Sequence, residues 1–200
     1  IINTYSVNTT FSLVSIATGT TPVCSRPQSG TSTITILPLP SVVISSNSTI
    51  CSGSSATVNF TGTPNATVTY KINGGNNQTI VLNASGSASL VNTYNSTTTI
   101  SLVSIASSGT PSCSQPQLGT VTITVIPLPI VTLSNNVNVC PNGSATVTFT
   151  GTPNATVTYN VNGGSNQTIV LNSSGTATIT NTYSTTTTYN LVSITSATTP

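Results

Sequence analysis

The feature that most constrains this chain is a repeat of 89 residues. The tripeptide Asn-Thr-Tyr begins at positions 3, 92 and 181. The segment from Gly62 to Tyr70 recurs letter for letter from Gly151 to Tyr159. Because the spacing between motifs is kept along with the letters, the pattern indicates tandem copies of one module rather than low-complexity sequence.

Two proline-flanked tripeptides mark the module boundaries. Pro-Leu-Pro occurs at residues 38–40 and again at 127–129. Proline fixes φ and favours an extended neighbour, so we expect Pro38, Pro40, Pro127 and Pro129 to form short, stiff joints. These joints predict the C-terminal part of one repeat at 1–40, a complete repeat at 41–129, and the N-terminal and central part of a third at 130–200. Because Pro200 aligns with Pro111 inside the complete repeat, we expect the 200 residues to belong to a longer protein.

The complete repeat has the pattern of antiparallel β-strands. Short alternating runs rich in β-branched residues are bounded by turn residues, and none has a helical period. Asn73-Gly-Gly and Ser85-Gly mark two turns, because both Asn and Gly tolerate positive φ. Seven strands in about 89 residues predict an all-β fold of tandem seven-stranded antiparallel immunoglobulin-like sandwiches. The predicted strands are 42–45, 56–61, 67–72, 79–82, 88–91, 98–105 and 120–126.

Composition argues strongly against catalysis. The chain has no Asp, Glu or His, and its only charged side chains are Arg26 and Lys71. General acid–base catalysis and an activated Ser or Thr nucleophile both need a proton-transfer group of the missing types. Calcium and zinc lack their usual ligands as well, and two positive charges neutralise too few phosphates for nucleic-acid binding. We therefore expect no enzyme activity, no cofactor, no metal site and no nucleic-acid partner.

The apolar residues do not predict a membrane segment. No window approaches 18 consecutive apolar residues, because Thr, Ser and Asn interrupt every run. The alternating Val, Ile, Leu and Thr residues supply enough apolar surface for folded cores, so we expect a folded chain and no membrane insertion in this segment.

Four motifs lie at residues 38–40, 51–58, 62–75 and 77–83. Together they resemble the tandem immunoglobulin-like or PKD-like repeats of giant cell-surface proteins of Bacteroidota, particularly the gliding-motility adhesins of flavobacteria, and the resemblance extends over essentially the whole chain. It implies an extracellular location on the cell surface and export by the type IX secretion system.

The four cysteines leave three arrangements open. An oxidising location favours disulfides. A bond between Cys51 and Cys113 within one repeat is preferred and contributes about 4 kcal/mol on the chain-entropy model. However, the two loops lie at opposite ends of a simple sandwich, so a bond to a neighbouring repeat and free thiols are the alternatives. With pairing inside each repeat, Cys24 and Cys140 have partners outside these 200 residues.

Asn-x-Ser/Thr triplets are frequent, but a chain this rich in Asn, Ser and Thr produces most of them by chance. The candidate glycosylation sites are Asn65, Asn77, Asn154 and Asn166. We prefer the interpretation that these are ordinary turn and strand-surface residues.

These observations favour a structural or adhesive stalk in a long extracellular repeat protein. Its partners would be neighbouring repeats of the same chain. One alternative is a self-assembling filament in which one copy donates a strand or an edge to another. A second alternative is a carbohydrate-binding module for surface glycans, although the chain has no Trp and few aromatic residues for stacking on sugars.

Overall fold

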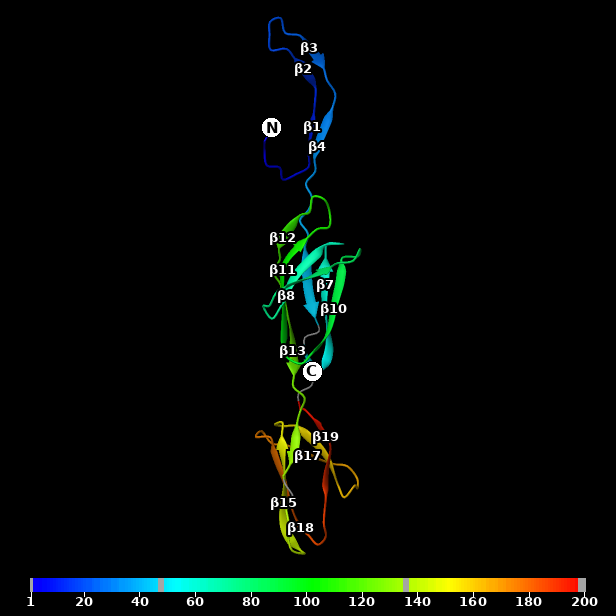
Figure 1. The fold of residues 1–200 in the computed structure, drawn as a ribbon, viewed down its shortest axis with the longest axis vertical. Coiled ribbons are helices and arrows are strands. Elements are labelled where there is room, and N and C mark those ends of the chain that lie inside the picture. Colours follow the sequence, from blue (N-terminus) through cyan, green and yellow to red (C-terminus); the bar gives the residue numbers. More distant parts are fainter. Residues whose placement is uncertain (1, 47–48, 135–136, 198–200) are drawn as a thin grey trace. The chain divides into compact units, whose positions relative to one another are not determined.

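Every regular element of the protein is a β-strand in the residues that the computed structural model describes, which are 2–46, 49–134 and 137–197 (Figure 1). The prediction of an all-β fold is confirmed for these ranges. The physical reason is that Thr, Val and Ile, stiff at χ1, fit a pleated surface better than a helix. Across the same ranges, no helix has the length and apolarity needed to span a membrane.

The chain divides into two compact units. The first comprises Ile1–Ile44, Asn59–Ala88 and Ser101–Gly119, and the second comprises Ser45–Val58, Ser89–Ile100 and Thr120–Pro200. The boundaries proposed from the sequence at 1–40, 41–129 and 130–200 stay predictions.

Two small antiparallel pairs lie at the start of the first unit. Strand β1 (Thr9–Ser12) pairs with β4 (Thr31–Ile34), and β2 (Ser15–Ala17) pairs with β3 (Ser25–Pro27). Most of their side chains are exposed, so this segment buries little apolar surface.

Two larger sheets follow along the chain. The first has the order β10 (Ser87–Tyr94), β7 (Ser54–Gly62), β5 (Val42–Ser46). The second has the order β6 (Thr49–Cys51), β13 (Thr120–Ile126), β11 (Thr98–Ala106), β8 (Thr67–Ile72), β9 (Asn77–Val81), with β12 (Ser114–Pro116) paired to the end of β11. Strand β6 runs parallel to β13, with Ile50 opposite Val125.

The C-terminal part of the second unit has two three-stranded sheets around one core. One sheet has the order β14 (Val131–Leu133), β15 (Gly143–Gly151), β18 (Thr176–Tyr183), and the other has the order β17 (Gln167–Val170), β16 (Thr156–Val161), β19 (Tyr189–Thr195). Phe149 of β15 meets Tyr159 of β16 with ring centroids 5.2 Å apart, and Val157 and Leu171 complete the buried cluster. Both sheets supply this core, as in sandwich packing.

Elements 89 residues apart match closely. Strands β7 and β15 have bounds that differ by 89 at both ends, as do β8 and β16. Their contacts match too: Tyr70 donates a hydrogen bond to Gln78 (3.2 Å), and Tyr159 donates one to Gln167 (3.0 Å).

All seven predicted strand positions coincide with described strands, namely β5, β7, β8, β9, β10, β11 and β13. The predicted turns are present as well. Asn73 and Gly74 have φ values of 48° and 69°, and Gly75 N–H donates to Ile72 O, which is the pattern of a type I′ turn. The described part of 41–129 contains two further short strands, β6 and β12, which the sequence pattern did not predict.

Candidate functional site: the proline-flanked joints

The first joint is held by hydrogen bonds to residues that follow it in the chain. Pro38 is exposed, but Pro40 is fully buried. The next residue, Ser41, donates from its N–H to Thr63 Oγ1 (3.0 Å) and accepts from Thr63 N–H at its own carbonyl (2.9 Å). In addition, Gln115 Nε2 of β12 donates to the Pro40 carbonyl (2.7 Å). The chain leaving this joint therefore enters β5 in a fixed direction.

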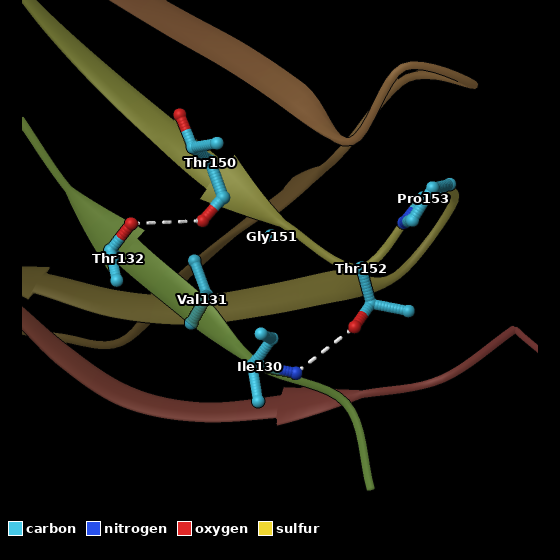
Figure 2. A pocket seen from close by; sticks show the side chains of 7 residues that line it. All are labelled: Ile130, Val131, Thr132, Thr150, Gly151, Thr152 and Pro153. Carbon is cyan, nitrogen blue, oxygen red and sulfur yellow. Dashed lines mark hydrogen bonds between the residues drawn. The ribbon is translucent and has the colours of Figure 1, made fainter. Parts of the chain in front are cut away.

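The second joint repeats the reciprocal clamp. After exposed Pro127 and half-buried Pro129, Ile130 N–H donates to Thr152 Oγ1 (3.0 Å), and Thr152 N–H donates back to Ile130 O (2.9 Å). Figure 2 shows the first of these bonds, together with the bond from Thr132 Oγ1 to Thr150 O (3.2 Å). A threonine is suited to this role because its hydroxyl accepts while its backbone N–H donates.

Glycine is required beside each clamp. Gly151 N–H donates to Gly175 O (2.8 Å), and a Cβ atom added at Gly151 would collide with the Ile130 carbonyl. In the first joint, a Cβ at Gly62 would collide with Ser41 O in the same way. Three backbone segments thus meet where no side chain fits.

The second joint borders a cavity of about 450 Å³. Figure 2 shows its lining, which is mostly apolar and carries hydroxyls as its only polar side-chain groups. None of these hydroxyl groups transfers protons near neutral pH, so the side chains that line the cavity include no general acid or base. The lining residues are Ile130, Val131, Thr132, Thr150, Gly151, Thr152 and Pro153.

The four joint prolines were singled out from the sequence, but their partners were not. The partners all lie in the segment that recurs letter for letter at 62–70 and 151–159, namely Gly62, Thr63, Gly151 and Thr152. That identity was the available signal. It could not show which residues approach the joint, because the contact joins residues more than twenty positions apart.

All four cysteines are free thiols in the structure, and no disulfide joins Cys51 to Cys113 there. Cys51 ends β6, opposite Ile126. Cys113 lies in the β11–β12 connection, where its N–H donates to Ser107 Oγ (2.9 Å) and its carbonyl accepts from Ser107 N–H. Cys24 makes the same pair of bonds with Thr18, while Cys140 accepts from Gly143 N–H in a turn. The disulfide pairing stays a prediction.

All four candidate glycosylation sites are exposed. Asn65 and Asn154 have positive φ values of 57° and 60°, which identifies them as turn residues. Asn77 starts β9 opposite Lys71, and Asn166 precedes β17. Their positions agree with turn and strand-surface roles, and their modification stays a prediction.

A tyrosine cluster that the sequence did not single out lies in the C-terminal part of the second unit. The hydroxyls of Tyr183 and Tyr189 are 2.9 Å apart, and the Tyr189 ring stacks on Tyr159 at 6.0 Å between centroids. Burial, reinforced by Tyr189, raises the pKa of Tyr159 above its ordinary value. The hydrogen bond to Tyr189, followed by burial, raises the pKa of Tyr183. Both groups therefore stay neutral at physiological pH.

Within 2–46, 49–134 and 137–197, no three His, Cys, Asp or Glu side chains gather in a group able to hold a metal ion. Comparison with models of protein families and with curated proteins gives no match for this chain. The resemblance to Bacteroidota surface repeats therefore stays an expectation.

Proposed function

We propose that the chain is a load-bearing stalk segment of a long extracellular repeat protein on a bacterial surface, built from tandem immunoglobulin-like sandwiches of about 89 residues. The matched strand bounds of β7 with β15 and of β8 with β16 support the repeat. The location rests on the resemblance described above, and the absence of carboxylates and histidine supports a mechanical rather than a chemical role.

The observation that carries the mechanical proposal is the parallel pairing of β6 with β13. Thr49, Ile50 and Cys51 lie opposite residues 124–126, and Ser52 N–H adds a bond to Ile126 O (2.8 Å). In the sequence, β5 lies between the first joint and β6, and β13 ends at Ile126, directly before the second joint. Tension applied between the joints pulls these parallel strands in opposite directions along their length. Their hydrogen bonds are then loaded together in shear rather than opened one at a time.

The joints support the same proposal. The reciprocal bonds of Ser41 with Thr63 and of Ile130 with Thr152 fasten the connector to the next module just before its first strand. Since proline leaves the connector few conformations, little of an applied extension is lost in straightening a slack linker.

Single-molecule force spectroscopy of the chain pulled between its two ends tests the proposal. The decisive variant is Ser52→Pro, which removes the N–H that bonds Ile126 O. Proline already occupies the aligned position in the next copy, Pro141, so we expect the variant to fold. Ser52→Ala is the matched control because it keeps the backbone donor.

We expect the wild-type chain and Ser52→Ala to share a clear unfolding-force peak that is lower in Ser52→Pro. A wild-type chain that extends without a resolvable peak would refute the load-bearing role. Equal unfolding forces in all three proteins would show that the pairing of β6 with β13 does not determine the unfolding force.

A further inference from the structure

One edge of the larger sheet in the middle of the chain is open. Strand β9 lies at the end of the order β6, β13, β11, β8, β9 and pairs with β8 alone among the described residues. Every residue between the two Pro-Leu-Pro tripeptides lies inside the chain, and in their described part, 41–46 and 49–126, no other strand reaches this edge. The aligned strand β17 also lies at the end of its sheet, next to β16. The open edge is therefore a feature of the fold around β9 itself.

The backbone groups at this edge point outward at every second residue. Leu82 N–H donates to Ala66 O (2.9 Å), which fixes the positions of the hydrogen-bonded pairs between β8 and β9. The residues between those pairs, Asn77, Thr79 and Val81, direct their N–H and carbonyl groups away from β8. Strand β9 thus offers a row of donors and acceptors to one more antiparallel strand.

Nothing on β9 protects this edge in the ways that are usual for edge strands, which are charged side chains, proline and bulges. The strand contains no charged residue and no proline, and its register with β8 continues without a bulge. Val81 is 62% exposed, and the aligned Val170 of β17 is 61% exposed. Lys71 lies one strand away, opposite Asn77. The position aligned with Lys71 is Asn160, so the edge at β17 has no such charge beside it.

The chain repeats this edge without change. Residues 77–81 and 166–170 have the same five letters, Asn-Gln-Thr-Ile-Val. Strands β5 and β10, at the edges of the other sheet, differ in sequence from the aligned strands β14 and β18. Of these edges, the one at β9 and β17 is therefore the edge that any two copies of the chain present to each other in identical form.

From this we infer that two copies of the chain associate side by side through antiparallel pairing of this edge with itself. A twofold axis at Thr79 places Thr79 opposite Thr79 of the second copy, and Asn77 opposite Val81 of the second copy. All the outward N–H and carbonyl groups of β9 are then paired, and the two sheets become continuous. A second copy is the occupant that the edge favours, because an antiparallel strand is complementary to itself and this one brings no charge that its twin would repel. Strand β17 can pair in the same way.

The same axis keeps the two Lys71 side chains apart. They are separated by three strand spacings, about 14 Å in all, before any displacement along the strands is counted. That distance exceeds the Debye length of about 8 Å at physiological ionic strength. Their repulsion therefore does not oppose the pairing.

Sedimentation velocity of the whole chain over a roughly hundredfold range of concentration tests this inference. We expect the weight-average mass to rise at least about 1.5-fold at the highest concentration. The double variant Thr79→Lys with Thr168→Lys places like charges directly opposite each other and should stay monomeric. Its fold should persist, because both side chains are exposed and the backbone groups of these residues point away from β8 and β16.

The matched control adds the same charge to the edge of the other sheet. Thr93→Lys with Thr182→Lys changes exposed, aligned residues of β10 and β18. We expect this variant to associate as the wild type does. Association that survives Thr79→Lys with Thr168→Lys, or that is lost in the control instead, would overturn the inference.

Crosslinking tests the register in a background with all four native cysteines replaced by Ser. Thr79→Cys with Thr168→Cys places thiols directly opposite each other, at a Cα separation of about 5.5 Å that a disulfide can span. Val81→Cys with Val170→Cys is the control on the same strands, because those thiols lie about 13 Å apart along the paired strands. Mild oxidation should give several-fold more disulfide-linked dimer with the first pair than with the second.

A wild-type chain that is monomeric at every concentration, or equal crosslinking by the two cysteine pairs, would refute the pairing. Neither result affects the stalk proposal, because the force experiment concerns bonds within one copy.

Discussion

At Gly62 and Gly151, the backbone of a joint residue lies where a Cβ atom would be. We expect Gly62→Ala to push Ser41 away from the clamp and to lower the free energy of unfolding by about 1–3 kcal/mol, the usual cost of overpacking. The measurement is the midpoint of urea unfolding followed by circular dichroism.

Gly109→Ala is the control for this substitution. A Cβ atom at Gly109 would have Pro111 O as its nearest neighbour at 3.8 Å, an ordinary contact. We expect a change within about 0.5 kcal/mol. Equal midpoints for Gly62→Ala and the wild type would contradict the close contact at the joint.

The raised pKa values in the tyrosine cluster make stability depend on pH in the alkaline range. The pKa values of Tyr159 and Tyr183 are raised above 10.0 in the folded protein, so folding favours the neutral phenols. Their contribution is complete below the pKa of the unfolded state, near 10.0, and is lost as the pH rises through the folded-state values. We expect the Tm to fall above about pH 10.

At lower pH, by contrast, we expect the Tm to be independent of pH. With no Asp, Glu or His, the chain has no side-chain carboxylate or imidazole to take up a proton as the pH falls from about 7 to about 5. A Tm measured by calorimetry should therefore be constant in that interval, and a drop of several degrees there would contradict this account.

At the scale of strands, aligned residues have unequal structural importance. Ile105 of β11 is fully buried, whereas the aligned Ile16 of β2 is 63% exposed. We expect Ile105→Ala to cost about 2–5 kcal/mol, through lost apolar burial and the cavity left behind.

Ile16→Ala is the matched substitution and should change stability by less than about 0.5 kcal/mol. Urea midpoints of the two variants provide the comparison. A similar cost at both positions would mean that the segment around β2 is packed as tightly as the segment around β11.

The sequence predicted those strands whose pattern is complete within the strand itself. Thr67–Ile72 and Thr120–Ile126 have the predicted bounds, because alternation and flanking turn residues specify them locally. Strands β6 and β12 are each three residues long, and each exists through a partner distant in the sequence, β13 or β11. No local pattern specifies such strands.

At the joints too, local sequence predicted the connector itself but not its partners, which are distant in the sequence. The fixed φ of Pro38, Pro40, Pro127 and Pro129 made a stiff connector predictable from the sequence. The hydrogen bond from Gln115 to the Pro40 carbonyl was not predictable, because it joins residues 75 positions apart. The Cys51–Cys113 pairing depended on the same kind of missing information, namely how the long β11–β12 connection folds.

For the molecule as a whole, the near absence of charge leaves its polar surface to hydroxyl and amide groups. The formal net charge is +2, and no anionic side chain exists to pair with either cation. Stability should therefore respond little to moderate salt, because no side-chain ion pairs exist to be screened.

Scarcity of basic residues also decides which proteases recognise the chain. Trypsin needs Lys or Arg before the bond that it cuts, and Arg26 is followed by proline, which blocks cleavage. Only the bond after Lys71 remains, inside β8 and half-buried opposite Asn77. We expect trypsin to leave the native chain intact and to split the denatured chain once, into residues 1–71 and 72–200, as mass spectrometry would show.

A protease that cuts after apolar residues is the control, since it should degrade the denatured chain at many bonds. Rapid trypsin cleavage of the native chain at Lys71 would show that β8 opens readily. In surroundings rich in trypsin-like enzymes, the scarcity of cleavable bonds gives this chain durability that persists even while a module is unfolded.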